Sequence, residues 1–277
     1  MSKSRVNTVY EIIVVGVSAI ALFAMQHIVG EFPVTLFRFP LNILVAALWC
    51  ALLVGIYRKR STSRLSQALL SMRATILSLS LIITLGIVLG LQAKPHTESW
   101  PVVGAILFVL SHLVLITIRG ARDGQHRLRI RFLLNHLGLI LAIGAGFWGA
   151  PDREELRVIV ESDKPTNEAY RSDGKMTLLD YNMQLSDFDI EYYDTGAPSA
   201  FKAGVVVDGR EQTLRVNHPY NRTLSETIYL ISYDTERGAD ARYCIVEVVR
   251  EPWRWLSVAG IVMLMAGAVL MFIQGKR

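Results

Sequence analysis

The chain has 277 residues, of which 52% are hydrophobic and 19% charged, and its formal net charge is +5. Because the apolar residues come in long blocks and not in amphipathic periods, the composition excludes an ordinary soluble domain and indicates an integral membrane protein. The basic residues fall in short loops beside the apolar blocks, where membrane topology explains them, so we expect no nucleic-acid partner.

Six apolar segments are long enough to cross a lipid bilayer, which requires roughly 20 mainly apolar residues. They are expected at residues 9–30, 40–57, 74–92, 100–118, 132–150 and 254–273. Between the second and third segments, apolar residues recur at helical spacing at Leu65, Ala68, Leu69 and Met72. This spacing predicts a short helix at the membrane surface.

The basic residues predict the orientation of these segments, because cytoplasmic loops carry an excess of Lys and Arg. With alternating segments, one side receives Lys3, Arg5, Arg58, Lys59, Arg60, Arg64, Arg73, Arg119, Arg122, Arg127, Arg129, Arg131, Lys276 and Arg277. The short loops on the other side carry only Arg38 and Lys94. We therefore expect a multi-pass protein of the cytoplasmic membrane, with both termini cytoplasmic and residues 151–253 extracytoplasmic.

Residues 151–253 have the period-two alternation of β-strands, separated by turn residues. The alternating runs lie at 156–160, 185–192, 205–207, 214–216, 228–233 and 243–249. Asp208 and Gly209 stand between two of these runs and predict a tight hairpin, and Asp187 is expected to interrupt one of them. No convincing helix is visible in this stretch, so an all-β domain, either an antiparallel sandwich or an open barrel, is expected.

The predicted architecture is thus six transmembrane helices with one extracytoplasmic β-domain between helices 5 and 6. Residues 1–150 form the N-terminal membrane domain with five helices, residues 151–253 the β-domain, and residues 254–277 the last helix with a short cytoplasmic tail.

Three histidines lie within the predicted spans, where polar side chains are costly and are therefore candidates for function. His112 and His136 are expected near the cytoplasmic ends of their helices and could share a layer, whereas His27 lies near the outer end of the first. A neutral imidazole can ligate haem iron or another metal, and it can equally hold a hydrogen bond between helices. The sequence leaves both roles open for each histidine.

The β-domain offers little chemistry of its own. His218, between a predicted strand and Pro219, is a candidate contact for an outer ligand. The carboxylate pairs Asp187 with Asp189 and Glu154 with Glu155 lack the nucleophile, metal-ligand spacing or glycine-rich loop that would define a reaction. We therefore expect no catalytic residue, and no metal other than a possible haem iron.

Several stretches together resemble ResB/CcsB proteins of the system II cytochrome c biogenesis pathway. They are the helix start His136-Leu137-Gly138-Leu139 and the segments Leu185–Tyr193, Val216–Tyr220, Ile228–Asp234 and Val246–Trp253. Residues Gln26–Asn42 are more loosely similar. The order of these motifs, with the long outer insert before the last helix, carries the resemblance.

The resemblance implies a subunit of a haem-export and cytochrome c assembly complex, whose partners would be a CcsA/ResC-type haem-handling membrane subunit and apocytochrome c. Haem b would be held transiently, with His112 as the best positional match to the family's transmembrane histidine and His136 as its competitor. The tryptophan-rich motif of the partner is absent here, so the chain is expected to be an accessory subunit that does not attach haem alone. A membrane-anchored scaffold, whose β-domain recruits partner proteins without binding haem, is the alternative.

Overall fold

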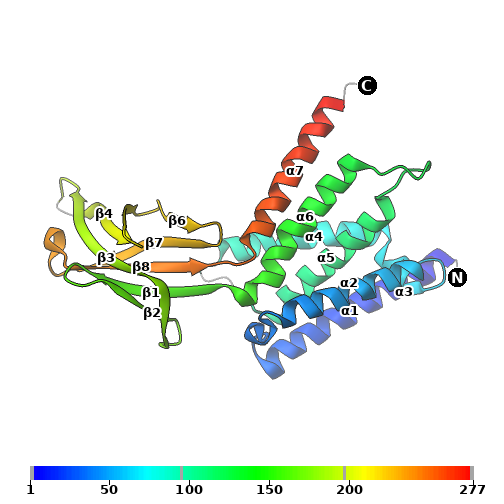
Figure 1. Ribbon diagram of the computed structural model, residues 1–277. Helices are drawn as coiled ribbons and strands as arrows, with labels where there is room; N and C mark the ends of the chain where they lie inside the picture. The colour runs from blue at the N-terminus through cyan, green and yellow to red at the C-terminus, as the bar shows by residue number, and fades with distance from the viewer. Residues whose placement is uncertain (1–2, 94–95, 196–197, 275–277) are drawn as a thin grey trace. The chain divides into compact units, whose positions relative to one another are not determined.

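The computed structural model describes residues 3–93, 96–195 and 198–274. The chain divides into two compact units, which Figure 1 shows as helices and as a sheet. The helical unit contains the residues up to Pro151 and those from Leu256 onward, and the sheet unit runs from Asp152 to Trp255. Lys94, Lys276 and Arg277, which contributed to the predicted orientation, lie outside the described residues.

The α-helices confirm the six predicted apolar segments. They are α1 (Lys3–Val29), α2 (Leu41–Arg58), α3 (Arg64–Leu69), α4 (Met72–Leu91), α5 (Trp100–Gly120), α6 (Ile130–Gly149) and α7 (Arg254–Gln274). All except α3 are long and apolar enough to cross a membrane, so the chain is a multi-pass membrane protein. The short helix α3 confirms the helical spacing found between the second and third segments. A 3-10 turn, η1 (Val34–Phe37), precedes α2, and a second, η2 (Ala150–Asp152), follows α6.

Helix α5 is the centre of the helical unit and contacts α1, α2, α4 and α6. Two side-chain hydrogen bonds join the helices around it: Trp49 Nε1 donates to Ser111 Oγ over 3.0 Å, and the fully buried Asn42 donates from Nδ2 to the Trp148 carbonyl over 2.9 Å. Lipid offers no competing partner to such groups, so these bonds fix which helix faces meet.

Helices α6 and α7 approach each other closely at two glycines. A Cβ atom placed on Gly260 would lie 2.6 Å from the Gly138 carbonyl oxygen and 2.6 Å from the Ala142 amide nitrogen, which is closer than van der Waals contact allows. Both obstructing atoms belong to the backbone and cannot rotate away. Only glycine at position 260 therefore permits this packing, as in other membrane helix pairs that meet at small residues.

The sheet unit contains one eight-stranded antiparallel sheet in the strand order β5-β4-β3-β2-β1-β8-β7-β6. The strands are β1 (Glu154–Glu161), β2 (Thr166–Arg171), β3 (Met176–Tyr192), β4 (Pro198–Val207), β5 (Arg210–Arg215), β6 (Tyr220–Thr223), β7 (Glu226–Tyr233) and β8 (Tyr243–Arg250). One 3-10 turn, η3 (Gly238–Asp240), precedes β8. The strands β2 and β6 were not predicted, because neither carries the alternation of apolar and polar residues that signals a half-buried strand.

The hairpin predicted at Asp208 and Gly209 is confirmed. Their φ angles of 52° and 74° place both residues in the left-handed region, which a tight hairpin turn requires. The expected interruption at Asp187 is a β-bulge: β3 continues through it, but its pairing with β4 shifts between Leu185 and Asp187. The prediction therefore identified an irregularity correctly but divided one long strand.

The core of the sheet unit is a single cluster of buried side chains on one face of the sheet. Strand β1 contributes Leu156, Val158 and Val160, each fully buried, in the predicted alternation. The same cluster includes Leu214 from the edge strand β5 and Ile228 from β7, which lie near opposite ends of the strand order. The sheet therefore curves around its own core. Its description as a sandwich or an open barrel stays a prediction.

The first and last strands of the sheet pair side by side over their full length, from Glu154 opposite Arg250 to Glu161 opposite Tyr243. Beyond the paired end, Trp253 Nε1 donates to Asp152 Oδ2 over 2.7 Å. The chain thus enters and leaves the sheet unit at one end, which we call the base of the sheet.

Replacing Gly260 by Leu should destabilise the purified full-length protein, because the new side chain collides with the backbone of α6. Overpacking of this kind costs about 1–3 kcal/mol, and thermal unfolding in detergent, followed by tryptophan fluorescence, will measure it. Gly86→Leu is the matched control, since nothing lies within 4 Å of a Cβ at Gly86 in α4. Equal melting temperatures for the two variants would contradict the close packing of α6 and α7.

Candidate functional site

The three transmembrane histidines lie in different surroundings. His112 is buried in α5, and both of its ring nitrogens are hydrogen-bonded. Nδ1 lies 2.8 Å from the Leu69 carbonyl oxygen, which can only accept, so Nδ1 carries the proton. Nε2 of the neutral ring then accepts from the Thr75 hydroxyl at 3.1 Å. His112 therefore connects α5 to the end of α3 and the start of α4.

This arrangement is that of a histidine which holds helices together. Haem iron would need the lone pair of Nε2, which is engaged by Thr75 here. His27 lies at the other end of the unit, exposed on α1, and His218 is exposed in the turn between β5 and β6, where its amide donates to the Arg215 carbonyl. Haem binding by His112 or His27, and ligand contact by His218, stay predictions.

His136, in the second turn of α6, differs from His112 in its free nitrogen. Its Nδ1 lies 2.9 Å from the Phe132 carbonyl oxygen and must donate to it, so the neutral ring carries its lone pair on Nε2. The ring also stacks on Phe132, with 3.8 Å between the ring centroids. Among the residues that the structure describes, Nε2 has no hydrogen-bond partner. A histidine whose first nitrogen donates to a carbonyl while the second is free has the arrangement typical of metal ligands.

His136 lines a pocket of about 700 Å³ between the start of α6 and the end of α7, within the size range of small-molecule sites. We call it the His136 pocket. Its walls are formed by Leu128, Arg129, Ile130, Arg131, Phe132, Asn135, His136, Leu270 and Met271.

The lining of the His136 pocket fits a flat apolar ligand that bears acidic groups. Ile130, Phe132 and Leu270 supply apolar surface, while Arg129 and Arg131 supply two guanidinium groups, and no carboxylate is among the lining residues. Arg129 lies over the Phe132 ring, 4.9 Å from its centroid, which keeps the guanidinium beside the pocket. Haem combines an apolar macrocycle, two carboxylates and an iron that accepts imidazole nitrogen, so this donor set fits it.

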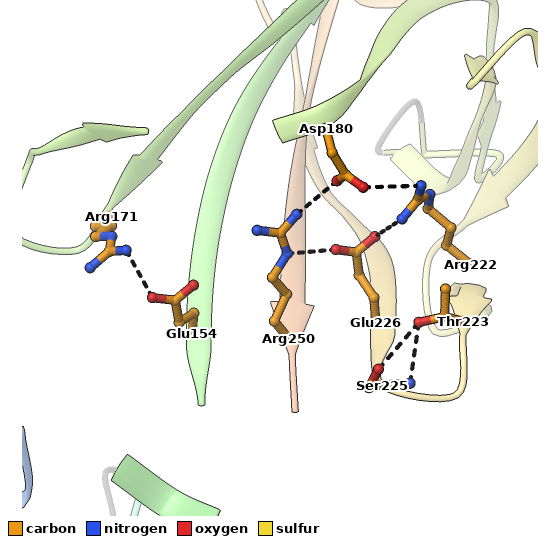
Figure 2. Close-up of polar contacts among 8 residues, drawn as sticks. All are labelled: Glu154, Arg171, Asp180, Arg222, Thr223, Ser225, Glu226 and Arg250. Atoms are coloured by element: carbon orange, nitrogen blue, oxygen red, sulfur yellow. Dashed lines mark hydrogen bonds and ion pairs between the residues drawn. The ribbon is translucent and has the colours of Figure 1, made fainter. Parts of the chain in front are cut away.

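A second polar constellation lies at the base of the sheet, where Figure 2 shows two arginines and two carboxylates joined in a ring. Glu226, with only 7% of its side chain exposed, pairs with Arg222 at 3.1 Å and with Arg250 at 2.6 Å. Asp180 closes the ring, 3.2 Å from Arg250 and 3.6 Å from Arg222. We call these four residues the base ring.

The base ring joins β3 to the neighbouring strands β6, β7 and β8. In the strand order, β2 and β1 lie between β3 and these three strands. Its charges balance, so it leaves no unpaired charge for acid–base chemistry. The buried Tyr181 lies beneath it, with the Arg222 guanidinium 3.9 Å from the ring centroid. Burial and the neighbouring Glu226 carboxylate raise the pKa of Tyr181 above its usual range, so the phenol remains protonated at neutral pH. The base ring therefore holds β3 to β6, β7 and β8 through side-chain ion pairs.

Nucleophilic and metal chemistry find little support in the sheet unit. Cys244 is fully buried in β8, and burial raises its pKa to about 12, so the thiol is neutral and unreactive at physiological pH. In the described parts of the chain, no group of three or more His, Cys, Asp or Glu side chains could hold a metal ion.

Sequence reasoning missed both constellations as spatial groups. Arg129 and Arg131 were interpreted only as topology signals, and Leu270 and Met271 carry no sequence signal that links them to His136. Glu226, Arg222 and Arg250 lie in ordinary strand positions, so only the pairing of β6, β7 and β8 reveals that they meet.

Comparison with known proteins supports the resemblance found in the sequence. Residues 124–245 match the model of the ResB-like family, a range that includes the start of α6 with His136 and most of the sheet unit. The motifs at Gln26–Asn42 and Val246–Trp253 lie outside that match. A solved structure of "Cytochrome c Heme Lyase CcmF" aligns with 83% of this chain and 39% of its own, with 14% sequence identity and a TM-score of 0.38. This chain thus spans well under half the length of that protein. No curated protein matches.

His112→Ala should lower the stability of the full-length protein, because Leu69 and Thr75 lose their partner inside the helical unit. The loss of two buried hydrogen bonds predicts about 1–3 kcal/mol, measured as a fall in melting temperature in detergent. His27→Ala, at an exposed position on α1, is the control and should melt like the wild type. An unchanged melting temperature for His112→Ala would contradict the structural role.

Glu226→Gln should loosen the sheet unit by about 2 kcal/mol, because both arginines lose a charged acceptor. Hydrogen exchange of the full-length protein will measure this as faster exchange of the amides in β3, β7 and β8. Glu161→Gln is the matched control, since Glu161 pairs with Lys164 on the surface and its loss should cost under about 0.5 kcal/mol. Equal exchange in the two variants would mean that the base ring does not hold the sheet together.

Proposed function

We propose that this chain, which is ResB-like over residues 124–245, is a subunit of a haem-export and cytochrome c assembly complex. Haem b is its cargo. The helical unit holds haem that comes from the cytoplasmic side and passes it to a CcsA/ResC-type partner. The partner then attaches haem to the thiols of apocytochrome c, and the present chain supports this attachment as the accessory subunit.

The observation that carries this proposal is the unpaired Nε2 of His136 beside the His136 pocket. The family match covers this helix start and thereby directs attention to it. Of the three transmembrane histidines, His136 alone combines a ring nitrogen without a hydrogen-bond partner in the described chain, a ring fixed by a backbone carbonyl and a lined pocket. We therefore assign haem contact to His136 and a helix-pairing role to His112.

The residues around His136 have separable tasks in this proposal. The Phe132 carbonyl fixes the tautomer and orientation of the imidazole, and the Phe132 ring limits its rotation. Arg129 and Arg131 bind the two carboxylates of haem, and the apolar side chains from α6 and α7 exclude water from the iron. When bound, haem supplies an iron atom that accepts the imidazole. A single protein ligand suits a carrier, because the cargo must leave again.

We also propose that the protein lies in the cytoplasmic membrane with both termini in the cytoplasm. The basic residues at one end of the spans support this orientation. The His136 pocket lies at that basic end, which is where cytoplasmic haem would arrive. The sheet unit, which we place outside the cytoplasm, would brace the partner or present apocytochrome c.

His136→Ala should lose haem when the complex with its CcsA/ResC-type partner is purified. The removal of the only proposed imidazole ligand predicts a fall in haem per complex of at least roughly tenfold, measured by the pyridine haemochrome assay. His112→Ala should keep its haem although it melts at a lower temperature. Added imidazole should restore part of the haem absorbance of His136→Ala, since it can occupy the vacated position.

Two outcomes would contradict this assignment. Haem retention in His136→Ala with loss in His112→Ala would transfer the ligand role to His112. A complex without haem in the wild type, combined with normal cytochrome c yield in both variants, would favour the alternative of a scaffold that recruits partners without binding haem.

A further inference from the structure

The helical unit contains a second pocket that the haem proposal does not use. We propose that this pocket binds the phosphate-bearing headgroup of an anionic membrane lipid, with Arg64 and Arg73 as the phosphate-binding residues. The pocket has a volume of about 330 Å³, near the lower limit of small-molecule sites. It is lined by Tyr10, Glu11, Arg64, Gln67, Ala68, Ser71 and Arg73. This inference is independent of the haem proposal.

The pocket lies where two membrane spans end. Tyr10 and Glu11 belong to the first turn of the apolar part of α1, which begins at Val9, and Arg73 belongs to the first turn of α4. The short helix α3 supplies the third wall and contacts both of these helices. Lipid headgroups occupy the level at which apolar spans give way to polar loops, so the pocket is at the depth of a lipid phosphate.

The charges in the pocket leave one cation unpaired. Arg73 forms an ion pair with Glu11 at 2.9 Å. Arg64 makes no hydrogen bond or ion pair with any residue that the structure describes, and Glu11 is the only carboxylate among the lining residues. The hydroxyl groups of Tyr10 and Ser71 and the Gln67 amide add neutral polar groups. The pocket therefore carries a net positive charge, which a phosphate would neutralise.

The surroundings favour a lipid over a soluble phosphate. Ile12 and Met72, the chain neighbours of Glu11 and Arg73, have exposed fractions of 66% and 75%. Both extend the apolar surface of the spans beside the pocket, where acyl chains would lie. A ligand with a phosphate on one end and hydrocarbon on the other matches this combination, and basic pockets between membrane helices are known to hold anionic headgroups.

The test uses the full-length protein purified in detergent, freed of lipid and examined by native mass spectrometry. We expect it to retain added phosphatidylglycerol in preference to phosphatidylcholine. Arg64→Gln should weaken retention of phosphatidylglycerol roughly fivefold, the effect of one cation at a membrane surface, and leave phosphatidylcholine unchanged. Arg60→Gln is the matched control, because Arg60 lies in the same basic loop but stacks on Tyr57 and does not line the pocket.

Two further variants separate the headgroup site from general loss of structure. Ala68→Phe fills the pocket without changing its charge and should reduce phosphatidylglycerol retention as Arg64→Gln does. Glu11→Gln removes the carboxylate that competes for Arg73 and should increase retention, a direction that misfolding would not produce. Equal retention in Arg64→Gln and Arg60→Gln, or in the two lipids, would overturn the proposal. Displacement of phosphatidylglycerol by millimolar inorganic phosphate would overturn the choice of lipid and assign the pocket to free phosphate.

Discussion

The constraint on which the helical unit depends is that a polar atom in hydrocarbon must find its partner within the protein. Asn42, Trp49, Ser111 and His112 all obey it, and each of them makes at least one hydrogen bond to another helix. Because water offers no alternative within the bilayer, such bonds determine which faces meet, although each contributes only about 1 kcal/mol. Polar side chains whose hydrogen-bonding groups all have partners therefore fix the packing of the helices. Among the described residues, a polar side chain with a free donor or acceptor, such as His136 at Nε2, is a candidate for ligand contact.

In the sheet unit, ion pairs between charged side chains hold strands together. Its base is where the first and last strands leave for α6 and α7, so the ends of four strands must be held together by side chains. A buried carboxylate alone would be costly, but Glu226 receives two guanidinium groups and Asp180 completes the ring. The planar guanidinium groups of the two arginines fix the relative positions of β3, β6, β7 and β8. Because every charge of the base ring is paired within the ring, the ring has no free acid or base for a reaction.

The sequence predicts the helices and strands of this fold better than it predicts the contacts between them. Long apolar blocks located all six spans, because a bilayer imposes a length that few other structures need. Alternation located β1, β7 and β8, whose inner faces are buried, but not β2 or β6, which present few apolar residues to the core. His136 was identified as a candidate from its place in a span. The sequence could not show how His136 differs from His112. The difference lies in the hydrogen bonds that Thr75 and Phe132 make and in the pocket lining from α7, which is more than a hundred residues away.

Some of the arginines at the basic end of the spans serve as topology signals and also line a pocket. As topology signals they act collectively, so any one of them can be replaced with little effect on orientation. A pocket, in contrast, needs a guanidinium at one place. Arg60 stacks on a neighbouring ring and fits the collective role, whereas Arg64 and Arg131 each line a pocket without an ion-pair partner in the described chain. The two pockets described above lie at the basic end of the spans, so guanidinium groups that serve as topology signals also line these pockets.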